Sequence, residues 1–360
     1  INQEVFMQAL TIQVQIFPSR EEQALLRQLA DEYIRVVNTL AEQAVTNGLF
    51  PKITTKDVDA FLPSAVLNQA IRDAKSVYRK SKKLGKRPVL KKRVYFVNNQ
   101  NYSIGEDFIA FPVVVGGKTK RVAFHAQWTE RHKKMLSNAK LGLLRIVEKS
   151  HRWYAQIALE VETPPERETG NTMGVDLGLK CPAVAVTSTG KTRFFGNGRM
   201  IKYIRRKYQS RRRKLGKLKK LAAIRKLGNK EHRWMTDQNH KISKQIINLA
   251  VQEGVSTIKL EKLANIRKTA RTSRKNAKNL HNWPFYQLAM FISYKAKLAG
   301  IRMVFVDPAY TSQSCPKCGT RNKARDRRYA CHACGYVTHR DRVGAMNILQ
   351  AVADGVAASP

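Results

Sequence analysis

The run Met173-Gly174-Val175-Asp176-Leu177-Gly178 places a single carboxylate at the end of a short apolar strand. Burying a carboxylate at such a point is costly unless it is paired or bound to a metal ion. The glycines on either side allow a backbone or a phosphate to approach closely. The run therefore predicts a strand that ends in a functional acid, and it is the starting point for the rest of the chain.

The elements after this run have the order of an RNase H-like fold. Two short strands joined by tight turns are predicted at 183–187 and 192–195. They are followed by long helices, buried strands and one further helix, in the order 200–227 (helix), 234–252 (helix), 256–260 (strand), 283–299 (helix) and 301–306 (strand). A three-stranded meander followed by alternating helices and strands indicates an α/β sheet of this class.

Two more carboxylates stand at comparable places. Glu261 ends the strand at 256–260, and Asp341 begins a final helix with apolar residues at 343, 346 and 349. Neighbouring strands would bring Asp176 and Glu261 together, and the helix would lay Asp341 across them. Three hard oxygen ligands suit Mg²⁺ or Mn²⁺. Two such ions about 4 Å apart promote phosphodiester hydrolysis.

Each carboxylate also has a purely structural explanation. Asp176 could be a turn residue, Glu261 an exposed residue at a strand end, and Asp341 the capping-box partner of Thr338. These explanations remain open for each residue alone. The three residues together, in this fold order and beside a strong positive charge, favour a catalytic set.

Four of the five cysteines form two matched pairs, Cys315-Pro316-Lys317-Cys318 and Cys331-His332-Ala333-Cys334. Each pair is followed by a glycine, which permits the backbone angles of a tight turn. Two such pairs predict tetrahedral coordination of structural Zn²⁺ by Cys315, Cys318, Cys331 and Cys334. The fifth, Cys181, is predicted to be a small buried residue near a strand turn.

The charge of the chain is extreme. Lys and Arg number 67 against 26 acids, giving a formal net charge of +41, whereas the 43% hydrophobic content is typical of a globular protein. Such a charge calls for a polyanion, and nucleic acid fits best because phosphate contacts release counterions. A membrane is the rival, but no stretch approaches the ~20 apolar residues of a spanning helix and no signal peptide opens the chain. Because the chain begins with Ile1, we expect at least one residue upstream.

Two basic stretches are candidate nucleic-acid contacts. Between residues 199 and 233 sixteen Lys or Arg accompany one acid, over apolar residues at three–four spacing, which predicts an amphipathic basic helix. The segment 266–280, directly after Glu261, is basic and rich in Ser, Thr and Asn, which indicates a mobile loop that closes over a bound strand. The candidate contacts are Arg205, Arg206, Arg211, Arg212, Arg213, Arg271, Arg274 and Lys275.

The first 165 residues predict a small β-barrel or open sheet with a helical insertion at about 18–90. Ser19 and Glu22 have capping-box spacing at the start of a helix, and a second helix follows Pro63-Ser64. Strands are predicted at 10–16, 94–97, 108–115 and 121–124, with a hairpin turn at Gly116-Gly117 and another hairpin over 143–161 that turns near residue 150. The stretch 162–171 is typical of an interdomain linker.

Several motifs together resemble the TnpB family of transposon-encoded RNA-guided nucleases, long described as OrfB-type transposases and related to type V CRISPR effectors. They are Gly174-Val175-Asp176-Leu177-Gly178, Glu261-Lys262-Leu263, Thr311-Ser312-Gln313 before Cys315, and His339-Arg340-Asp341 before Ala345-Met346-Asn347-Ile348. The order of elements agrees over the whole chain, but only the second half carries specific motifs.

The resemblance implies a RuvC-like nuclease with Asp176, Glu261 and Asp341 as ligands of Mg²⁺ or Mn²⁺. It implies a wedge-like barrel with a helical recognition insert (1–165), a nuclease domain in two parts (172–308 and 338–356) and an inserted zinc ribbon (309–337). The implied partners are a guide RNA from the transposon end and target double-stranded DNA, with no membrane. The expected location is the prokaryotic cytoplasm, with nucleoid association when the protein is bound to DNA.

Three other functions remain open. An RNA-guided DNA-binding protein that does not cut would be expected to have lost one of the three carboxylates, whereas this chain has all three. Strand-transfer transposases usually order their acids Asp, Asp, Glu, whereas this chain has Asp, Glu, Asp. A structural RNA-binding protein would explain the charge but not the positions of the carboxylates.

Overall fold

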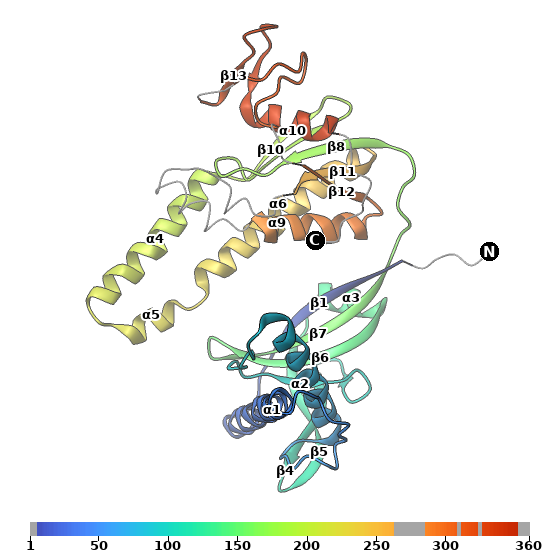
Figure 1. Cartoon of the computed structure of the whole chain (residues 1–360), viewed down its shortest axis with the longest axis vertical. Helices are drawn as coiled ribbons and strands as arrows, with labels where there is room; N and C mark the ends of the chain where they lie inside the picture. Colours follow the sequence, from blue (N-terminus) through green and yellow to red (C-terminus); the bar gives the residue numbers. More distant parts are fainter. Residues whose placement is uncertain (1–5, 263–284, 308–310, 323–325, 352–360) are drawn as a thin grey trace, which may run out of the picture. The chain divides into compact units, whose positions relative to one another are not determined.

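The computed structural model describes residues 6–262, 285–307, 311–322 and 326–351. The chain divides into two compact units (Figure 1). Residues 9–162 form one, called here the N-terminal unit. The residues from 163 onward, joined by the first eight residues, form the other, called here the C-terminal unit.

The N-terminal unit is built on a seven-stranded sheet in the order β2-β6-β7-β1-β5-β4-β3. Its strands are β1 (Phe6–Ile16), β2 (Tyr95–Val97), β3 (Ser103–Ile104), β4 (Phe108–Val115), β5 (Lys118–Gln127), β6 (Ala139–Lys149) and β7 (Arg152–Thr163). The two predicted hairpins are confirmed. Gly116 and Gly117 turn between β4 and β5 with φ of 58° and 75°, and the β6–β7 turn lies at Ser150 and His151. The sequence did not predict β3 or the short helix α3 (Glu130–Ser137).

Two long helices, α1 (Arg20–Thr46) and α2 (Ser64–Leu84), lie between β1 and β2 in the chain and pack on each other and on the sheet. The predicted capping box is present, because the Glu22 N–H donates to Ser19 Oγ (3.2 Å) and the Ser19 N–H donates to Glu22 Oε2 (2.6 Å). Apolar residues at helical spacing, such as Leu26, Leu29 and Tyr33, are fully buried. This single core covers both helices and the sheet.

The C-terminal unit is built on a five-stranded sheet in the order β10-β9-β8-β11-β12. The strands are β8 (Asn171–Asp176), β9 (Ala183–Thr187), β10 (Thr192–Phe195), β11 (Val255–Glu261) and β12 (Arg302–Val306). The first three pair antiparallel as a meander, and β11 pairs parallel with both β8 and β12. The predicted order of strands is confirmed. Cys181 is buried before β9, as expected.

Helices cover both faces of this sheet (Figure 1). On one face α6 (Lys230–Gln252) and α9 (Phe285–Leu298) form a core with the alternate strand residues Met173, Val175 and Leu260. On the other face α10 (Arg340–Gln350) packs against β8, β9 and β11. Alternation along each strand therefore decides which side chains face α10.

The basic segment predicted as one helix over 200–227 is two helices. The chain forms α4 (Gly198–Lys217), turns at Leu218–Lys220, and continues as α5 (Leu221–Leu227) before α6. At the turn Lys219 has a positive φ of 52°. Helix propensity alone did not reveal this break, because Leu and Lys on both sides are good helix formers.

The four paired cysteines lie between β12 and α10, in a segment with the short antiparallel strands β13 (Arg328–Ala330) and β14 (Val337–His339). Throughout the part of the chain that the structure describes, no helix combines the length and the apolar composition needed to cross a bilayer.

Candidate functional site

Asp176 faces α10 from the end of β8. Met173 and Val175 are fully buried in the core beneath α6 and α9. Because successive strand side chains point to opposite faces, Gly174 and Asp176 lie on the side covered by α10. The acid therefore ends a buried strand, as the sequence predicted, on the face away from the main core.

Glu261 reaches the same side from the adjacent parallel strand. The register of β8 and β11 places it next to Asp176. Leu260 is fully buried in the core beneath α6 and α9, so Glu261 and Lys259 point toward α10. A hydrogen bond agrees with this orientation, because Lys259 Nζ donates to the carbonyl oxygen of Leu349 at the C-terminal end of α10 (2.9 Å).

Asp341 lies in the first turn of α10. The N-cap is His339, whose Nδ1 accepts a hydrogen bond from the Asp341 N–H (3.2 Å). The capping-box explanation of Asp341, in which Thr338 caps the helix, is therefore wrong. The guanidinium of Arg327 approaches the Asp341 carboxylate to 3.9 Å.

Two glycines allow α10 to lie close to β8. A Cβ at Gly174 would be 2.3 Å from the carbonyl oxygen of Ala345, well inside ordinary contact. A Cβ at Gly344 would be 2.7 Å from Asp176 Oδ2. The close backbone approach predicted at the glycine before Asp176 is therefore present, and the approaching backbone is the helix that carries Asp341.

The three carboxylates form an electrostatically strained group. Burial raises the pKa of Asp176 to about 8, the charges of Glu261 and Asp341 act in the same direction, and Arg340 opposes them. Burial also raises the pKa of Glu261, against the effect of a hydrogen bond from Thr311. A cation bound between such acids would reduce the electrostatic repulsion that raises the pKa. Their oxygen donors fit a hard divalent ion.

Hydrogen bonds connect Glu261 to the segment that precedes the cysteines. Thr311 Oγ1 donates to Glu261 Oε1, and Thr311 is only 8% exposed. Asn347 on α10 donates from Nδ2 to the carbonyl oxygens of Thr311 (2.6 Å) and Ser314 (2.8 Å). Thr311 and Asn347 belong to the family-like motifs of the sequence, but no local pattern indicated these contacts.

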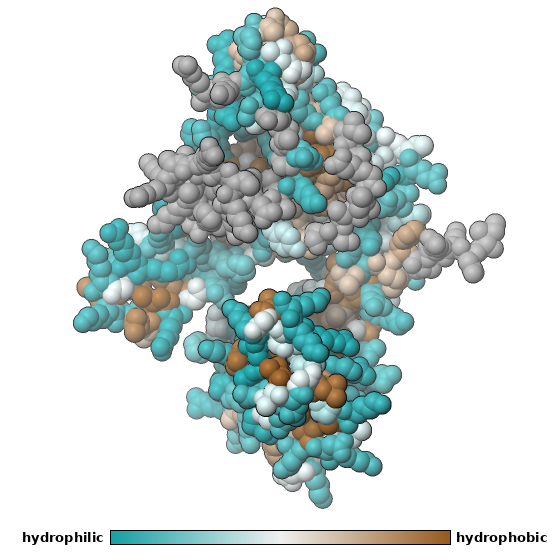
Figure 2. Space-filling view, in the orientation of Figure 1, coloured by the Kyte–Doolittle hydropathy of each residue, from teal (hydrophilic) through white to brown (hydrophobic). Residues whose placement is uncertain are grey.

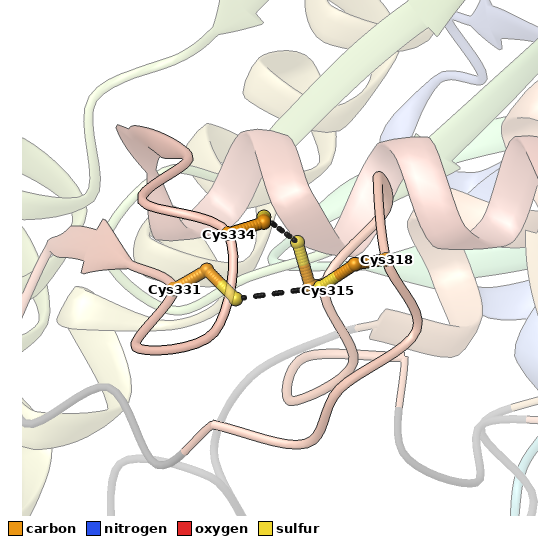
Figure 3. A group of neighbouring side chains, drawn as sticks. All are labelled: Cys315, Cys318, Cys331 and Cys334. Atoms are coloured by element: carbon orange, nitrogen blue, oxygen red, sulfur yellow. Dashed lines mark hydrogen bonds between the residues drawn. The ribbon is translucent and has the colours of Figure 1, made fainter.

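The four cysteines converge on one point (Figure 3). The Sγ atoms of Cys315 and Cys334 are 3.7 Å apart, and those of Cys318 and Cys331 are 3.5 Å apart. All four sulfur atoms lie within 4.8 Å of one another. Among the described residues this is the one group of three or more His, Cys, Asp or Glu side chains whose ligand atoms lie close enough together to hold a metal ion. Four thiols at this spacing fit tetrahedral zinc.

The turns that present the thiols have the predicted form. Gly319 and Gly335 follow the two cysteine pairs with φ of 74° and 70°. Their N–H groups donate to the carbonyl oxygens of Cys315 (2.9 Å) and Cys331 (3.0 Å), which closes each turn. The matching geometry of the two turns brings the four sulfur atoms together.

The sixteen basic residues of the stretch 199–233, which include five of the predicted contacts, lie on α4, the turn after it, α5 and the start of α6, called here the basic arm. Figure 2 shows mostly hydrophilic colours over the basic arm, with a few hydrophobic residues among them. Ile201 at its base is buried, but Leu218 and Leu221 at the turn are 53% and 61% exposed. Ile204, Tyr208 and Leu215 between them are half-buried, so full burial of the expected packed side is limited to its base.

The predicted contacts on the basic arm differ in accessibility. Arg206, Arg211 and Arg213 are exposed. Arg205 is half-buried, burial lowers its pKa, and its Nε has no partner among the described residues. Arg212 on α4 forms an ion pair with Glu231 on α6.

Arg271, Arg274 and Lys275 lie outside the described residues, as does the stretch 266–280 around them. The predicted phosphate contacts and the closing loop in this stretch stay predictions.

Two family models match the chain. The model described as "Probable transposase" of the OrfB type matches residues 156–267, and the model described as "Cas12f1-like, TNB domain" matches residues 285–348. The first range contains Asp176 and Glu261, and the second contains Asp341 and all four paired cysteines.

Curated relatives agree with these models. A CRISPR-associated endodeoxyribonuclease Cas12f1 of Sulfoacidibacillus thermotolerans is 31% identical over 220 residues, covering 56% of this chain and 50% of the relative. A TnpB-like protein of Methanocaldococcus jannaschii is 33% identical over 158 residues, covering 42% of this chain and 56% of the relative. The chain thus spans about half the length of these two relatives.

A solved structure shares the fold. The cryo-EM structure of a Cas12f1–sgRNA–target DNA complex contains a chain that matches with a TM-score of 0.70, at 14% identity, over 96% of this chain and 99% of that one. The motifs, the two family models, the relatives and the fold agree: the chain is a homologue of the TnpB-like and Cas12f1 proteins and fits the TnpB family.

Proposed function

We propose that this protein is an RNA-guided DNA endonuclease of an insertion-sequence transposon, with a RuvC-like active site. The observation that carries the proposal is the placement of Asp176, Glu261 and Asp341. Two acids end adjacent parallel strands, a third begins the helix that lies over them, and their charges act on one another. The fold alone has no need for three acids brought to the same end of the sheet, whereas a site for divalent cations does.

In this proposal Asp176, Glu261 and Asp341 hold Mg²⁺ or Mn²⁺, and Cys315, Cys318, Cys331 and Cys334 hold structural Zn²⁺. When bound, a pair of divalent ions would supply an activated water and would stabilise the leaving oxygen of the phosphodiester. The residues themselves orient these ions. Burial and crowding keep Asp176 protonated near neutral pH without a cation, so cation binding displaces its proton.

The nucleic-acid partners follow from the charge and from the relatives. The formal net charge of +41 and the exposed Arg206, Arg211 and Arg213 on the basic arm support binding along a phosphate backbone. We infer a guide RNA from the transposon end and a double-stranded DNA target as the partners. The seven-stranded sheet with α1 and α2 is interpreted as the wedge-like barrel and its recognition insert. The protein is expected to work in the prokaryotic cytoplasm.

The test is cleavage of a guide-matched DNA duplex by the purified RNA complex. Asp176→Ala, Glu261→Ala and Asp341→Ala are each expected to abolish cutting and to leave RNA binding nearly unchanged. Undiminished cutting by any one variant would remove that residue from the site. The control is Gln350→Ala, an exposed residue on the same helix as Asp341.

The RNA that copurifies with the protein separates the remaining alternatives. A discrete structured RNA whose 3′ end matches the cleaved DNA supports a guided nuclease. Heterogeneous RNA that is lost at moderate salt would favour a structural RNA-binding protein instead. Guided binding without cutting by the unaltered chain would favour a DNA-binding protein, and joining of DNA ends would favour a strand-transfer transposase.

A further inference from the structure

Thr311 restrains the carboxylate of Glu261. Its hydroxyl donates to Glu261 Oε1, and the side chain is nearly inaccessible to solvent. An ionised carboxylate has about four lone-pair positions on two oxygens, so this bond occupies one and leaves the rest for a cation. The bond also restricts rotation about the terminal torsion of Glu261, which is otherwise broad.

Asn347 fixes the position of Thr311. Its amide group has two hydrogens, and Nδ2 lies 2.6 Å from the Thr311 carbonyl oxygen and 2.8 Å from that of Ser314. One side chain therefore holds both ends of the turn 311–314 against α10. The same helix carries Asp341, so it positions one carboxylate directly and a second through Thr311.

The turn 311–314 leads directly into the cysteine cluster. Ser314 precedes Cys315, whose N–H donates to the Thr320 carbonyl oxygen (2.9 Å) and whose Sγ is 3.7 Å from that of Cys334. A zinc ion bound by the four thiols would fix Cys315 and hence the end of the turn that Asn347 holds. A segment of this size with little core of its own depends on such a metal for its fold.

We propose that Thr311 and Asn347 are positioning residues that connect the cysteine cluster to Glu261, so that zinc on the four thiols raises the affinity of the carboxylate site for a divalent cation. The inference rests on the proposed function, because it takes Glu261 as a cation ligand. Partners that hydrogen-bond to metal ligands typically contribute a factor of about 10–100 in metal affinity. Because linkage between two binding sites is reciprocal, the divalent cation raises zinc affinity by the same factor.

The test uses Mn²⁺ as the probe and electron paramagnetic resonance of the intact RNA–protein complex as the readout. Thr311→Val keeps the shape of the side chain and removes the hydroxyl, and it is expected to weaken Mn²⁺ binding about 10–100-fold with zinc content unchanged. Thr311→Ser keeps the hydroxyl and restores the affinity. Gln350→Ala is the matched control, because Gln350 Nε2 reaches Pro316 on the same segment (3.3 Å) but not Thr311.

A second arm removes zinc by dialysis against a chelator, followed by removal of the chelator. Zinc loss is expected to weaken Mn²⁺ binding of the unaltered protein about 10–100-fold and that of Thr311→Val by clearly less, since the connection is already broken. Equal losses in both proteins would overturn the role of Thr311 in the connection.

The outcomes also separate this inference from the proposed function. If Glu261→Ala abolishes cutting but Thr311→Val binds Mn²⁺ as tightly as the unaltered protein, the positioning role is refuted and the nuclease proposal stands. If Glu261→Ala itself leaves Mn²⁺ binding and cutting unchanged, Glu261 is not a cation ligand and the inference is refuted with its premise, whereas the nuclease activity stands.

Discussion

Gly174→Ala tests the geometry of the proposed active site without touching a carboxylate. An added Cβ would lie 2.3 Å from the carbonyl oxygen of Ala345, 2.5 Å from the backbone nitrogen of Leu349 and 2.8 Å from its Cβ. Two of these neighbours are backbone atoms of α10, so no side-chain rotation relieves the contact. Either α10 or β8 has to move.

The size of the movement follows from these separations. Ordinary van der Waals contact begins at 3.4 Å, so the 2.3 Å separation has to grow by about 1.1 Å. Overpacking of this kind costs about 1–3 kcal/mol of folding stability. Asp341 moves with α10, while Asp176 stays on β8. A misplacement of about 1 Å in a catalytic group costs about 100-fold in rate.

The assay is single-turnover cleavage of a guide-matched duplex, together with the thermal unfolding midpoint of the complex. We expect a loss of about 100-fold in rate at saturating Mg²⁺ and a lower midpoint. Gly216→Ala is the control, since Gly216 lies in α4 with open space around it, and alanine there is expected to leave cleavage unchanged and to stabilise slightly. Cleavage by Gly174→Ala at the rate of the control would refute the reasoning.

Three further predictions concern metal and pH. Cys331→Ser is expected to remove the bound zinc, measured as zinc content by atomic absorption, and retention of zinc would exclude the thiol as a ligand. Because the pKa of Asp176 is about 8, its proton stabilises the cation-free protein at low pH and this contribution is lost as pH rises toward 8. Mn²⁺ binding should therefore tighten from pH 6 to about 8, by up to tenfold per pH unit, and Asp176→Asn should flatten that profile. Arg27 holds the pKa of Glu148 low, so Glu148→Gln should lower the free energy of unfolding at pH 7 by no more than about 1 kcal/mol, measured as a lower thermal midpoint. The difference from the unaltered protein should vanish as the pH falls below 4.5, because Glu148 is then protonated. A difference that persists in acid would contradict the ion-pair explanation.

Features carried by local sequence were predicted well. The capping box at Ser19 and Glu22, the turn at Gly116-Gly117 and the strand ending at Asp176 each depend on residues within a few positions of one another. The compact cysteine cluster belongs to the same class, because each pair and its glycine make one turn.

Features that depend on tertiary contacts were not predicted. Thr311 meets Glu261 from fifty residues away, and no periodicity or spacing signals such a pair. The turn at Lys219 interrupts a run of good helix formers, so the return of α5 and α6 toward the sheet overrides local propensity. The N-cap of α10 was assigned to Thr338 in one alternative, because the capping role of His339 lies outside the usual set of Ser, Thr, Asp and Asn.

The location of Asp341 on α10 has a consequence for the timing of synthesis. Asp176 and Glu261 belong to the meander and the first parallel strand, but the third acid follows Glu261 by eighty residues. At about 5–20 residues per second, a ribosome needs about 4–16 s to translate that interval. During this time β8 and β11 have been made but the helix that covers them has not, and the proposed cutting centre is incomplete. If the proposed function is right, a nascent chain is expected to be unable to cut DNA until α10 has left the ribosome and docked on β8.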